Sequence, residues 1–431
     1  MDWWQISILL STHGFFKEYR PSEPFISPFL TQYKNFTIEQ INQEIYPLGT
    51  YFYLGLLILV FLLTDYLRYK PIVVTGGFSA VITYILLIYG ETLDTMKIVE
   101  FFYGFFMASE VAYFTYMYAK VDKVHYQKVT GYSRAAILLG NASAGLSSQL
   151  LVTFNLINYL QLNYLTLGGV ALGTLTSIFL PGVSQSLYFH RDSSEDITGN
   201  NSDYNNNSSS ITIVDYKKKK FINGKFRRAF NNFYADFKQA FTNTYVLQWS
   251  IWWAMASCGH LQVISYCQLL WEDIIQKTNE ELYNGYVDCA SSVLGAAISF
   301  LIGYINVKWN SWGQISLGFL TIFQGCFLYY CAYINKLYLA YLMHLIYQIF
   351  YNAAITVATY EVAKFIKERS HGLVFGINTF LALVLQSILT AVVIRALKTD
   401  IRNQFKVYGG YHVVIGIGFL VASIFRLFSH R

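Results

Sequence analysis

The run YFYLGLLILVFLL at residues 51–63 decides the fold, because it is strongly apolar and holds no charged side chain. Longer runs of similar character recur at residues 72–89, 98–119, 164–180 and 337–359. Most of them approach the roughly 20 residues that an α-helix needs to cross a bilayer core of about 30 Å. The cores of soluble proteins do not supply such runs repeatedly. The sequence therefore predicts an all-α membrane protein that crosses the bilayer many times.

The composition and the absence of motifs exclude several classes of function. Of the 431 residues, 54% are hydrophobic and only 13% are charged, whereas soluble domains carry about 25% charged residues. The sequence has no P-loop, GxSxG, HExxH or CxxC motif, which argues against an enzyme, a primary pump and a metal site. We expect no cofactor and no nucleic-acid partner, because topology accounts for the net charge of +6. Buried free thiols are expected at Cys258, Cys267, Cys289, Cys326 and Cys331.

Twelve spans are predicted, six on each side of a polar interval. They cover roughly residues 3–30 (interrupted), 46–64, 72–90, 96–119, 133–154, 163–183, 243–269, 285–306, 312–333, 338–362, 372–394 and 410–428. We divide the chain into an N-terminal six-helix bundle (1–187), a cytoplasmic loop (188–240) and a C-terminal six-helix bundle (241–431). The loop contains SSEDITGNNSDYNNNSSS, which is too polar to fold, and then a basic cluster. This organisation is typical of secondary transporters that bind substrate between two halves near the bilayer midplane.

The distribution of Lys and Arg predicts the orientation in the membrane. Basic residues concentrate in the loops after the even-numbered spans, including the KKKK run at residues 217–220. The loop before the last span is an exception, with Arg395, Lys398, Arg402 and Lys406. The positive-inside rule places both termini and the central loop in the cytoplasm, where the basic run also attracts anionic lipids. In a plasma-membrane protein the first loop then lies on the outer side of the membrane, and its sequon at Asn35 is accessible to glycosylation.

Acidic residues inside the predicted spans are the clearest functional signal. An ionisable side chain within a span costs several kcal/mol unless it is paired, hydrated or functional. Four acids lie at such positions: Glu23, Glu100, Glu110 and Asp288. Hardly any basic residue lies inside a predicted span, so the sequence predicts an acidic interior.

The fourth span carries the most regular pattern. At about 100° per residue, Glu100, Tyr103, Met107, Glu110 and Tyr113 fall on one stripe of a helix. Two carboxylates and two phenols on one face would line a cavity that holds a cation between charge and aromatic rings. Alternatively, Glu100 lies near the membrane boundary and only pairs or caps, and the tyrosines pack as core. The alternative is weaker for Glu110, which lies ten residues deeper in the span.

The first span contains RPSEPF at residues 20–25, whose two prolines remove amide donors and break a helix. Broken helices at membrane depth are tolerated where they line a cavity. Two roles remain open for Glu23, which either binds substrate or forms an ion pair with Arg20. Asp65 and Arg68, at the cytoplasmic end of the second span, are placed for a salt bridge that acts as a gate.

Several motifs together resemble the reduced folate and thiamine carrier family, within the major facilitator superfamily. In the first half they are RPSEPF, KNFT at residues 34–37, FLLTDYLRYKP at 61–71, EFFYG at 100–104, EVAY at 110–113 and HYQKVTGYSR at 125–134. In the second half they are WW at 252–253, QLLW at 268–271, YNG at 283–285 and GLVFGINTF at 372–380. The resemblance covers nearly the whole chain apart from the central loop. It implies two six-helix bundles and transport by alternating access.

The resemblance also implies a choice between a folate branch and a thiamine branch. Folate carriers have basic residues in the cavity, and at the positions aligned with these the chain has Glu110, Gln348 and Gln386. That set would repel a dicarboxylate and suits thiamine, which is a permanent cation. The resemblance therefore implies that Glu23, Glu110 and Tyr113 contact thiamine.

Further residues follow the thiamine branch, with one departure. The segments around Gln262, Tyr266 and Gln386 look like those of thiamine carriers, and Asp288 stands where these carriers have an acid. At Gly49, however, thiamine carriers have a tryptophan, so related organic cations and pyridoxine-like vitamins stay open as substrates.

The leading hypothesis is a plasma-membrane thiamine importer. Outward proton exchange is the energy source considered, with Glu110 or Glu23 as the proton carrier. The alternatives are a folate carrier and a receptor that binds a vitamin without moving it.

Overall fold

The computed structural model describes residues 2–121, 125–183, 234–235, 237–278, 281–302, 309–366 and 371–429, and these form helices and connecting turns without a strand. Most of the predicted loop 188–240, including its basic cluster, lies outside the described residues.

The N-terminal half is a series of helices in which two predicted spans are interrupted. Its helices are α1 (Trp3–Glu18), η1 (Glu23–Phe25), α2 (Ile26–Pro28), η2 (Phe29–Tyr33), α3 (Ile38–Gln40), η3 (Ile41–Ile45), α4 (Tyr46–Tyr66), α5 (Lys70–Tyr89), α6 (Leu93–Ala108), α7 (Glu110–Lys120), α8 (Tyr126–Thr153) and α9 (Tyr159–Ile178). The first interruption follows α1, next to Pro21 and Pro24, because a proline cannot donate to the helical ladder. The second, at Ser109, separates α6 from α7.

The C-terminal half has longer unbroken helices. They are α11 (Thr244–Thr278), α12 (Asn284–Ile302), α13 (Trp309–Cys331), α14 (Leu337–Phe365), α15 (His371–Thr390), η7 (Ala391–Ala396) and α16 (Ile401–Ser429). The π-helical segment η7 continues α15 directly, and the two together form one predicted span.

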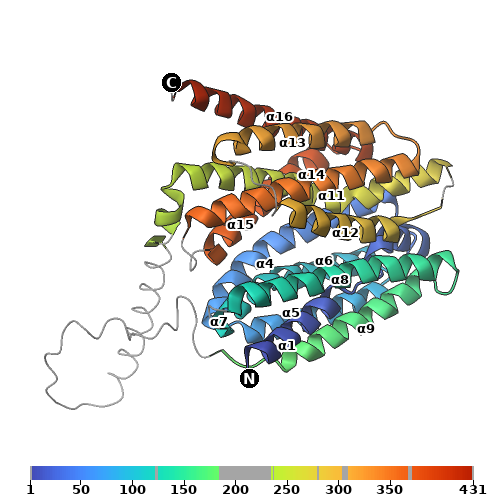
Figure 1. Ribbon diagram of the computed structural model, residues 1–431. Coiled ribbons are helices and arrows are strands. Elements are labelled where there is room, and N and C mark those ends of the chain that lie inside the picture. The colour runs from blue at the N-terminus through green and yellow to red at the C-terminus, as the bar shows by residue number, and fades with distance from the viewer. Residues whose placement is uncertain are drawn as a thin grey trace, which may run out of the picture.

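The two halves lie one against the other with their helices roughly aligned (Figure 1). In that view the blue-to-green helices α1 to α9 form the lower layer, and α11 to α16 form the upper layer. The start of α1 and the end of α16 lie at the same end of the bundle (Figure 1). Seven of the described helical segments are long and apolar enough to cross a membrane. The remaining helices carry polar or charged residues and are consistent with twelve spans.

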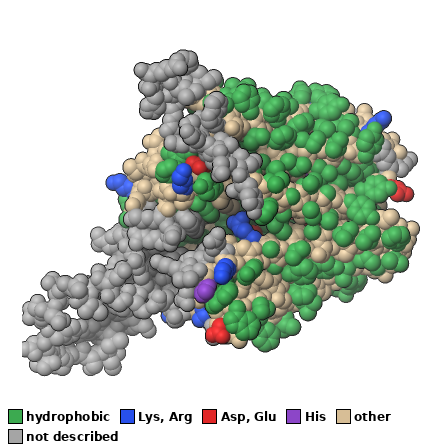
Figure 2. All heavy atoms as spheres, in the orientation of Figure 1, with side chains coloured by type: hydrophobic (Ala, Val, Ile, Leu, Met, Phe, Trp, Pro, Cys, Tyr) green, Lys and Arg blue, Asp and Glu red, His purple; other side chains and the backbone are tan. Residues whose placement is uncertain are grey.

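The surface agrees with a membrane setting. Hydrophobic side chains cover most of the face shown in Figure 2, and the coloured charged side chains gather mainly toward its two ends. Large apolar residues such as Leu62, Phe154 and Phe179 are more than half exposed. Exposed apolar surface of this extent is stable in lipid and not in water.

Two helix pairs join the halves along their length, α8 with α12 and α4 with α15. The first pair approaches closely at Gly145 and Gly285, where a Cβ on Gly145 would lie 2.6 Å from the Gly285 carbonyl oxygen. Glycine permits this approach because it has no side chain. The halves enclose a space between them, and α4, α5, α6 and α11 contribute most of its walls.

Candidate functional site

A cavity of about 300 Å³ lies between the two halves. Its polar lining residues are Glu23, Thr50, Thr83, Glu100, Ser265, Gln268 and Gln386. Four phenols line it as well: Tyr46, Tyr53, Tyr84 and Tyr103. Among the described lining residues there is no Lys or Arg, and the charged groups are two carboxylates. A cavity of this size, with a few polar groups in an apolar wall, is typical of a small-molecule site.

Glu100 is the carboxylate in this cavity that lacks a partner. It lies on α6 and is half-buried. Within the described part of the chain it forms no hydrogen bond or ion pair, and Tyr103 follows it one turn later along the cavity wall. An unpaired carboxylate at membrane depth is costly, so a positively charged guest in this cavity would be stabilised.

Glu23 lies at the break after α1, and three hydrogen bonds fix the position of its carboxylate. Its carboxylate accepts hydrogen bonds from Arg20 (2.5 Å), Tyr84 (3.1 Å) and Tyr103 (3.2 Å). About 32% of the side chain is exposed. The two roles left open by the sequence therefore coincide, since Glu23 is paired with Arg20 and also lines the cavity.

A chain of buried ion pairs runs from Glu23 along α1. Arg20 contacts Glu18 (2.6 Å), Glu18 contacts Lys17 (3.1 Å), and Lys17 contacts Glu110 (3.0 Å). The expectation that hardly any basic residue lies in the interior is wrong around α1, because Lys17 and Arg20 are buried beside the acids. Sequence reasoning overlooked the Lys17–Glu18 pair. Its signal was two adjacent charges inside a predicted span.

Glu110 and Tyr113 do not share the large cavity with Glu100. They line a separate space of about 10 Å³, with His13 and Lys17, which has room for about one water molecule. Tyr113 donates to the carbonyl of Leu10 (3.0 Å). The single predicted stripe is therefore divided between two spaces, since Glu100 and Glu110 lie about 15 Å apart along the helix axis and belong to α6 and α7.

Of the candidate site residues in the C-terminal half, some line the cavity and others are buried away from it. Gln386 lines the cavity. Gln262 is buried in the C-terminal half, where it donates to Tyr408 (3.0 Å) and accepts from Thr390 (3.1 Å). Tyr266 is buried too, and its ring packs edge-on against Tyr46 with centroids 5.9 Å apart. The polar residues of α11 that line the cavity are Ser265 and Gln268, and neither is among the site residues predicted from the sequence.

The remaining candidates lie outside the cavity lining. Asp65 accepts a hydrogen bond from Tyr69 (3.0 Å), and Arg68 is exposed at the end of α4. Asp288 is half-buried in the first turns of α12. Asn35 is exposed, with φ of 60°, in the turn between η2 and α3.

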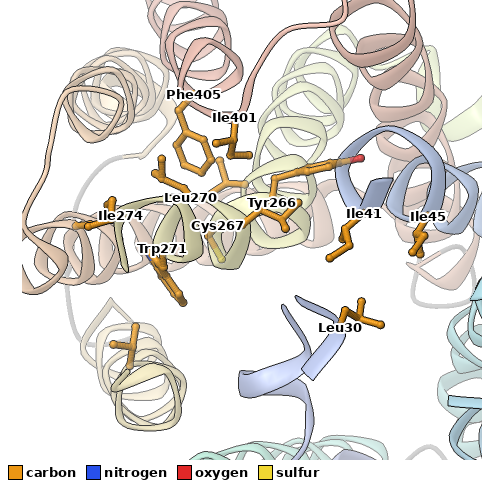
Figure 3. Close-up of a cluster of buried hydrophobic side chains, with 14 of the residues drawn as sticks. Leu30, Ile41, Ile45, Tyr266, Cys267, Leu270, Trp271, Ile274, Ile401 and Phe405 are labelled. Atoms are coloured by element: carbon orange, nitrogen blue, oxygen red, sulfur yellow. The ribbon is translucent and has the colours of Figure 1, made fainter. Parts of the chain in front are cut away.

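One end of the cavity is closed by an apolar cluster that joins the halves. Side chains from η2 and η3 lie near side chains from α11 and α16 (Figure 3). The labelled residues include Leu30, Ile41, Ile45, Leu270, Ile401 and Phe405. Leu30 and Ile45 also line the cavity. The cluster therefore separates the cavity from the medium at this end.

Hydrogen bonds between the halves reinforce the closed end. Asn284 donates to the carbonyl of Pro24 (2.8 Å), and Gln268 donates to the carbonyl of Glu23 (2.8 Å). Pro28, four residues after Pro24, has no amide hydrogen to donate to the Pro24 carbonyl, and the Glu23 carbonyl accepts from the amide of Ile26 as well as from Gln268. The break after α1 therefore provides both a cavity wall and a binding surface for the opposite half.

Comparison with known proteins places this geometry in a family. The model of the reduced folate carrier family matches residues 1–407. The chain belongs to this family. It is 35% identical to thiamine transporter 2 of Macaca fascicularis, over 100% of this chain and 92% of the relative. It is 36% identical to folate transporter 1 of Caenorhabditis elegans, over 99% of this chain and 92% of the relative.

The fold agrees with this membership. The structure of the POT family transporter PepTSo matches with a TM-score of 0.64 and 10% identity, covering 97% of each chain. The family member is thus a membrane transporter of the major facilitator type and not an enzyme. Because relatives with thiamine and folate names are equally similar, the choice of substrate depends on the cavity itself.

Proposed function

We propose that this transporter imports thiamine, an organic cation, across the plasma membrane by alternating access. The observation that carries the proposal is the unpaired carboxylate of Glu100 in a cavity whose described lining has no basic side chain. The phenols around it, including Tyr103 and Tyr84, offer aromatic faces to a cation. Glu23 adds a second carboxylate whose charge is shared with Arg20.

The same cavity disfavours a folate. A dicarboxylate placed here would meet Glu23 and Glu100 without a compensating cation on the lining. Like-charge contact in a site of low dielectric constant costs several kcal/mol. The folate names of some relatives are therefore the weaker guide to the substrate of this chain.

Alternating access supplies the transport step. In the proposed topology both termini are cytoplasmic, so the end of the cavity that the apolar cluster closes faces outward. Asn35 then lies outside, within reach of glycosylation. Import requires the apolar cluster to separate and the opposite end to close as the halves rock. Loss of glycosylation in an Asn35→Gln protein at the cell surface would support this orientation.

Competition for uptake tests the substrate. Cells that express the chain should take up labelled thiamine with saturation, and excess thiamine should suppress uptake more strongly than excess folate or pyridoxine. If excess folate suppressed uptake and excess thiamine did not, folate would be the substrate and not thiamine. Saturable binding without uptake would indicate a receptor.

Outward proton exchange is the proposed energy source, and Glu23 is the proposed carrier because it reaches the cavity. Glu110 is the other acid considered, but Lys17 occupies it in this state. Reconstituted vesicles with an imposed pH gradient provide the measurement. Thiamine uptake that is insensitive to the gradient would contradict proton coupling and leave the substrate assignment intact.

A further inference from the structure

Glu272 is a buried carboxylate whose partners are all neutral. It lies on α11 and is 2% exposed, and its Oε2 atom has no hydrogen-bond partner. Its Oε1 atom accepts from the hydroxyl of Thr31 (3.0 Å) and from the amide of Gln32 (3.4 Å), both on η2 of the other half. The Thr31 hydroxyl has one hydrogen, and the carbonyl of Ser27 (3.1 Å) is a second acceptor for it. Two neutral donors therefore stand where a cation would stabilise the carboxylate.

The adjacent acid shows that cations are present at this end of α11. Asp273 contacts Lys277 (2.9 Å) and Arg402 (2.7 Å). Within the part of the chain that the structure describes, no Lys, Arg or His forms an ion pair with Glu272. A carboxylate that is removed from water without a cation or a full set of donors is costly. A positively charged guest would relieve this cost.

Glu272 continues the polar stripe of α11 that lines the cavity. Ser265, Gln268 and Glu272 are spaced by three and four residues and so lie on one face of the helix. The first two line the cavity, and Glu272 lies about 6 Å beyond Gln268 along the helix axis. Leu270 and Trp271 beside it belong to the apolar cluster that closes this end (Figure 3). The carboxylate therefore lies one turn beyond the cavity, within the closed end.

We infer that Glu272 is an outer binding site for organic cations, which the substrate occupies before it reaches the cavity. When η2 moves away from α11, Thr31 and Gln32 leave the carboxylate, and its charge faces the opening. A cation bound there is one helical turn from Gln268 and the cavity. When the end closes, the two neutral side chains replace the cation. This inference rests on the proposed function, since the guest is taken to be an organic cation and the closed end to face outward.

A cysteine beside Glu272 measures the attraction of cations to this position. The background is a chain whose native cysteines are replaced by serine and which still takes up thiamine. Thr31→Cys in this background is labelled from outside cells by two thiosulfonate reagents of similar size, one with a trimethylammonium group and one neutral. Both reagents need the end to open, so the ratio of their rates, each corrected for its rate with a free thiol, does not depend on how often it opens. A carboxylate at about 4 Å should favour the cationic reagent by about fivefold even in water.

Substitutions of Glu272 test whether its charge causes this preference. Glu272→Gln and Glu272→Met both remove the charge and keep most of the length of the side chain, so the ratio should fall by about fivefold in either variant. Glu272→Asp keeps the charge and should keep the preference. Glu281→Gln is the matched control, because Glu281 is an exposed carboxylate beyond the end of α11 that accepts from the hydroxyl of Tyr283 (2.9 Å). That variant should keep the ratio of the unsubstituted background.

Uptake of labelled thiamine, measured in parallel, separates this inference from the proposed function. Saturable uptake by the wild type, with the same ratio before and after Glu272→Gln and Glu272→Met, overturns the outer site alone. An equal fall of the ratio in Glu281→Gln also overturns it, because the effect would come from the general charge of this surface. Normal uptake without labelling of Thr31→Cys by either reagent overturns it as well, because the position would not open outward. Absence of saturable thiamine uptake by the wild-type chain at the cell surface overturns the proposed function and this inference with it.

Discussion

Two glutamates ten residues apart have different surroundings, and a charge-neutral substitution should distinguish them. Glu100→Gln keeps the shape of the side chain and removes the charge that faces the cavity. We expect the KM for thiamine to rise by about tenfold or more, from the loss of a charge-assisted contact. Initial rates of uptake over a range of thiamine concentrations provide the measurement.

Glu110→Gln is the matched comparison, since it removes an equal charge outside the cavity lining. Its main effect should be a less stable protein, because Lys17 then keeps only Glu18 as a charged partner. A Glu110→Gln protein with normal melting temperature and a strongly raised KM would contradict this division of roles.

The sequence identified the acids but not their surroundings. Glu23 and Glu100 were selected because charge inside a span needs a reason, and both line the cavity. Glu110 is predicted beside them because helical periodicity gives the side of the helix that a residue faces. Periodicity does not give the depth at which a cavity ends, and Glu110 lines a different space.

At the scale of helices, the ion pairs beside α1 should contribute strongly to stability. Lys17→Met removes the ammonium group between Glu18 and Glu110, both of which stay in the interior. Removing one partner of a buried pair typically costs about 3–5 kcal/mol. We expect denaturant unfolding in detergent to show a loss of this order.

The double variant Lys17→Met with Glu110→Gln provides the control. It removes one cation and one anion together, so it should be more stable than Lys17→Met alone. If the free-energy losses of the two single variants simply added up in the double variant, the two side chains would not interact in the folded protein.

A second contact between helices lies outside the predicted spans and should depend on pH. Arg402, in α16, contacts Asp273 of α11 (2.7 Å) and the carbonyl of Ile334 (2.9 Å). Burial raises the pKa of Asp273, but hydrogen bonds from Lys277 and Arg402 outweigh it and hold the pKa below its usual value.

Because the folded-state pKa is lowered, this contribution to stability is full above the ordinary aspartate pKa of about 3.9 and is lost as the pH falls through the folded-state value. Melting temperatures of the wild type and of Asp273→Asn, measured between neutral and acidic pH, should therefore converge at low pH. A constant difference across the whole range would contradict the contribution of this carboxylate.

For the whole molecule, the sequence predicted two bundles and a broken first helix, and the structure places that break where the halves meet. Two prolines within four residues gave a local signal for the break. The sequence held no signal for the partners across the interface, Asn284 and Gln268, because they contact η1 from more than two hundred residues away in the chain. Contacts between halves depend on the relative placement of the bundles, which local pattern does not contain.

The closed end of the cavity should open more often when a bond between the halves is removed. Asn284 donates to the carbonyl of Pro24 and accepts from Tyr341 (2.6 Å), so Asn284→Ala leaves the Pro24 carbonyl without this donor. A shift of roughly 1–2 kcal/mol would raise the open population about tenfold.

The measurement is the labelling rate of a cysteine placed at the cavity residue Ser265 (Ser265→Cys) by an impermeant thiol reagent added outside cells. The background is a chain whose native cysteines are replaced by serine. Asn352→Ala is the control, because Asn352 donates within α14 (2.8 Å). Faster labelling in the Asn284 variant alone is expected, and equal rates in both variants would show that this contact does not hold the end closed.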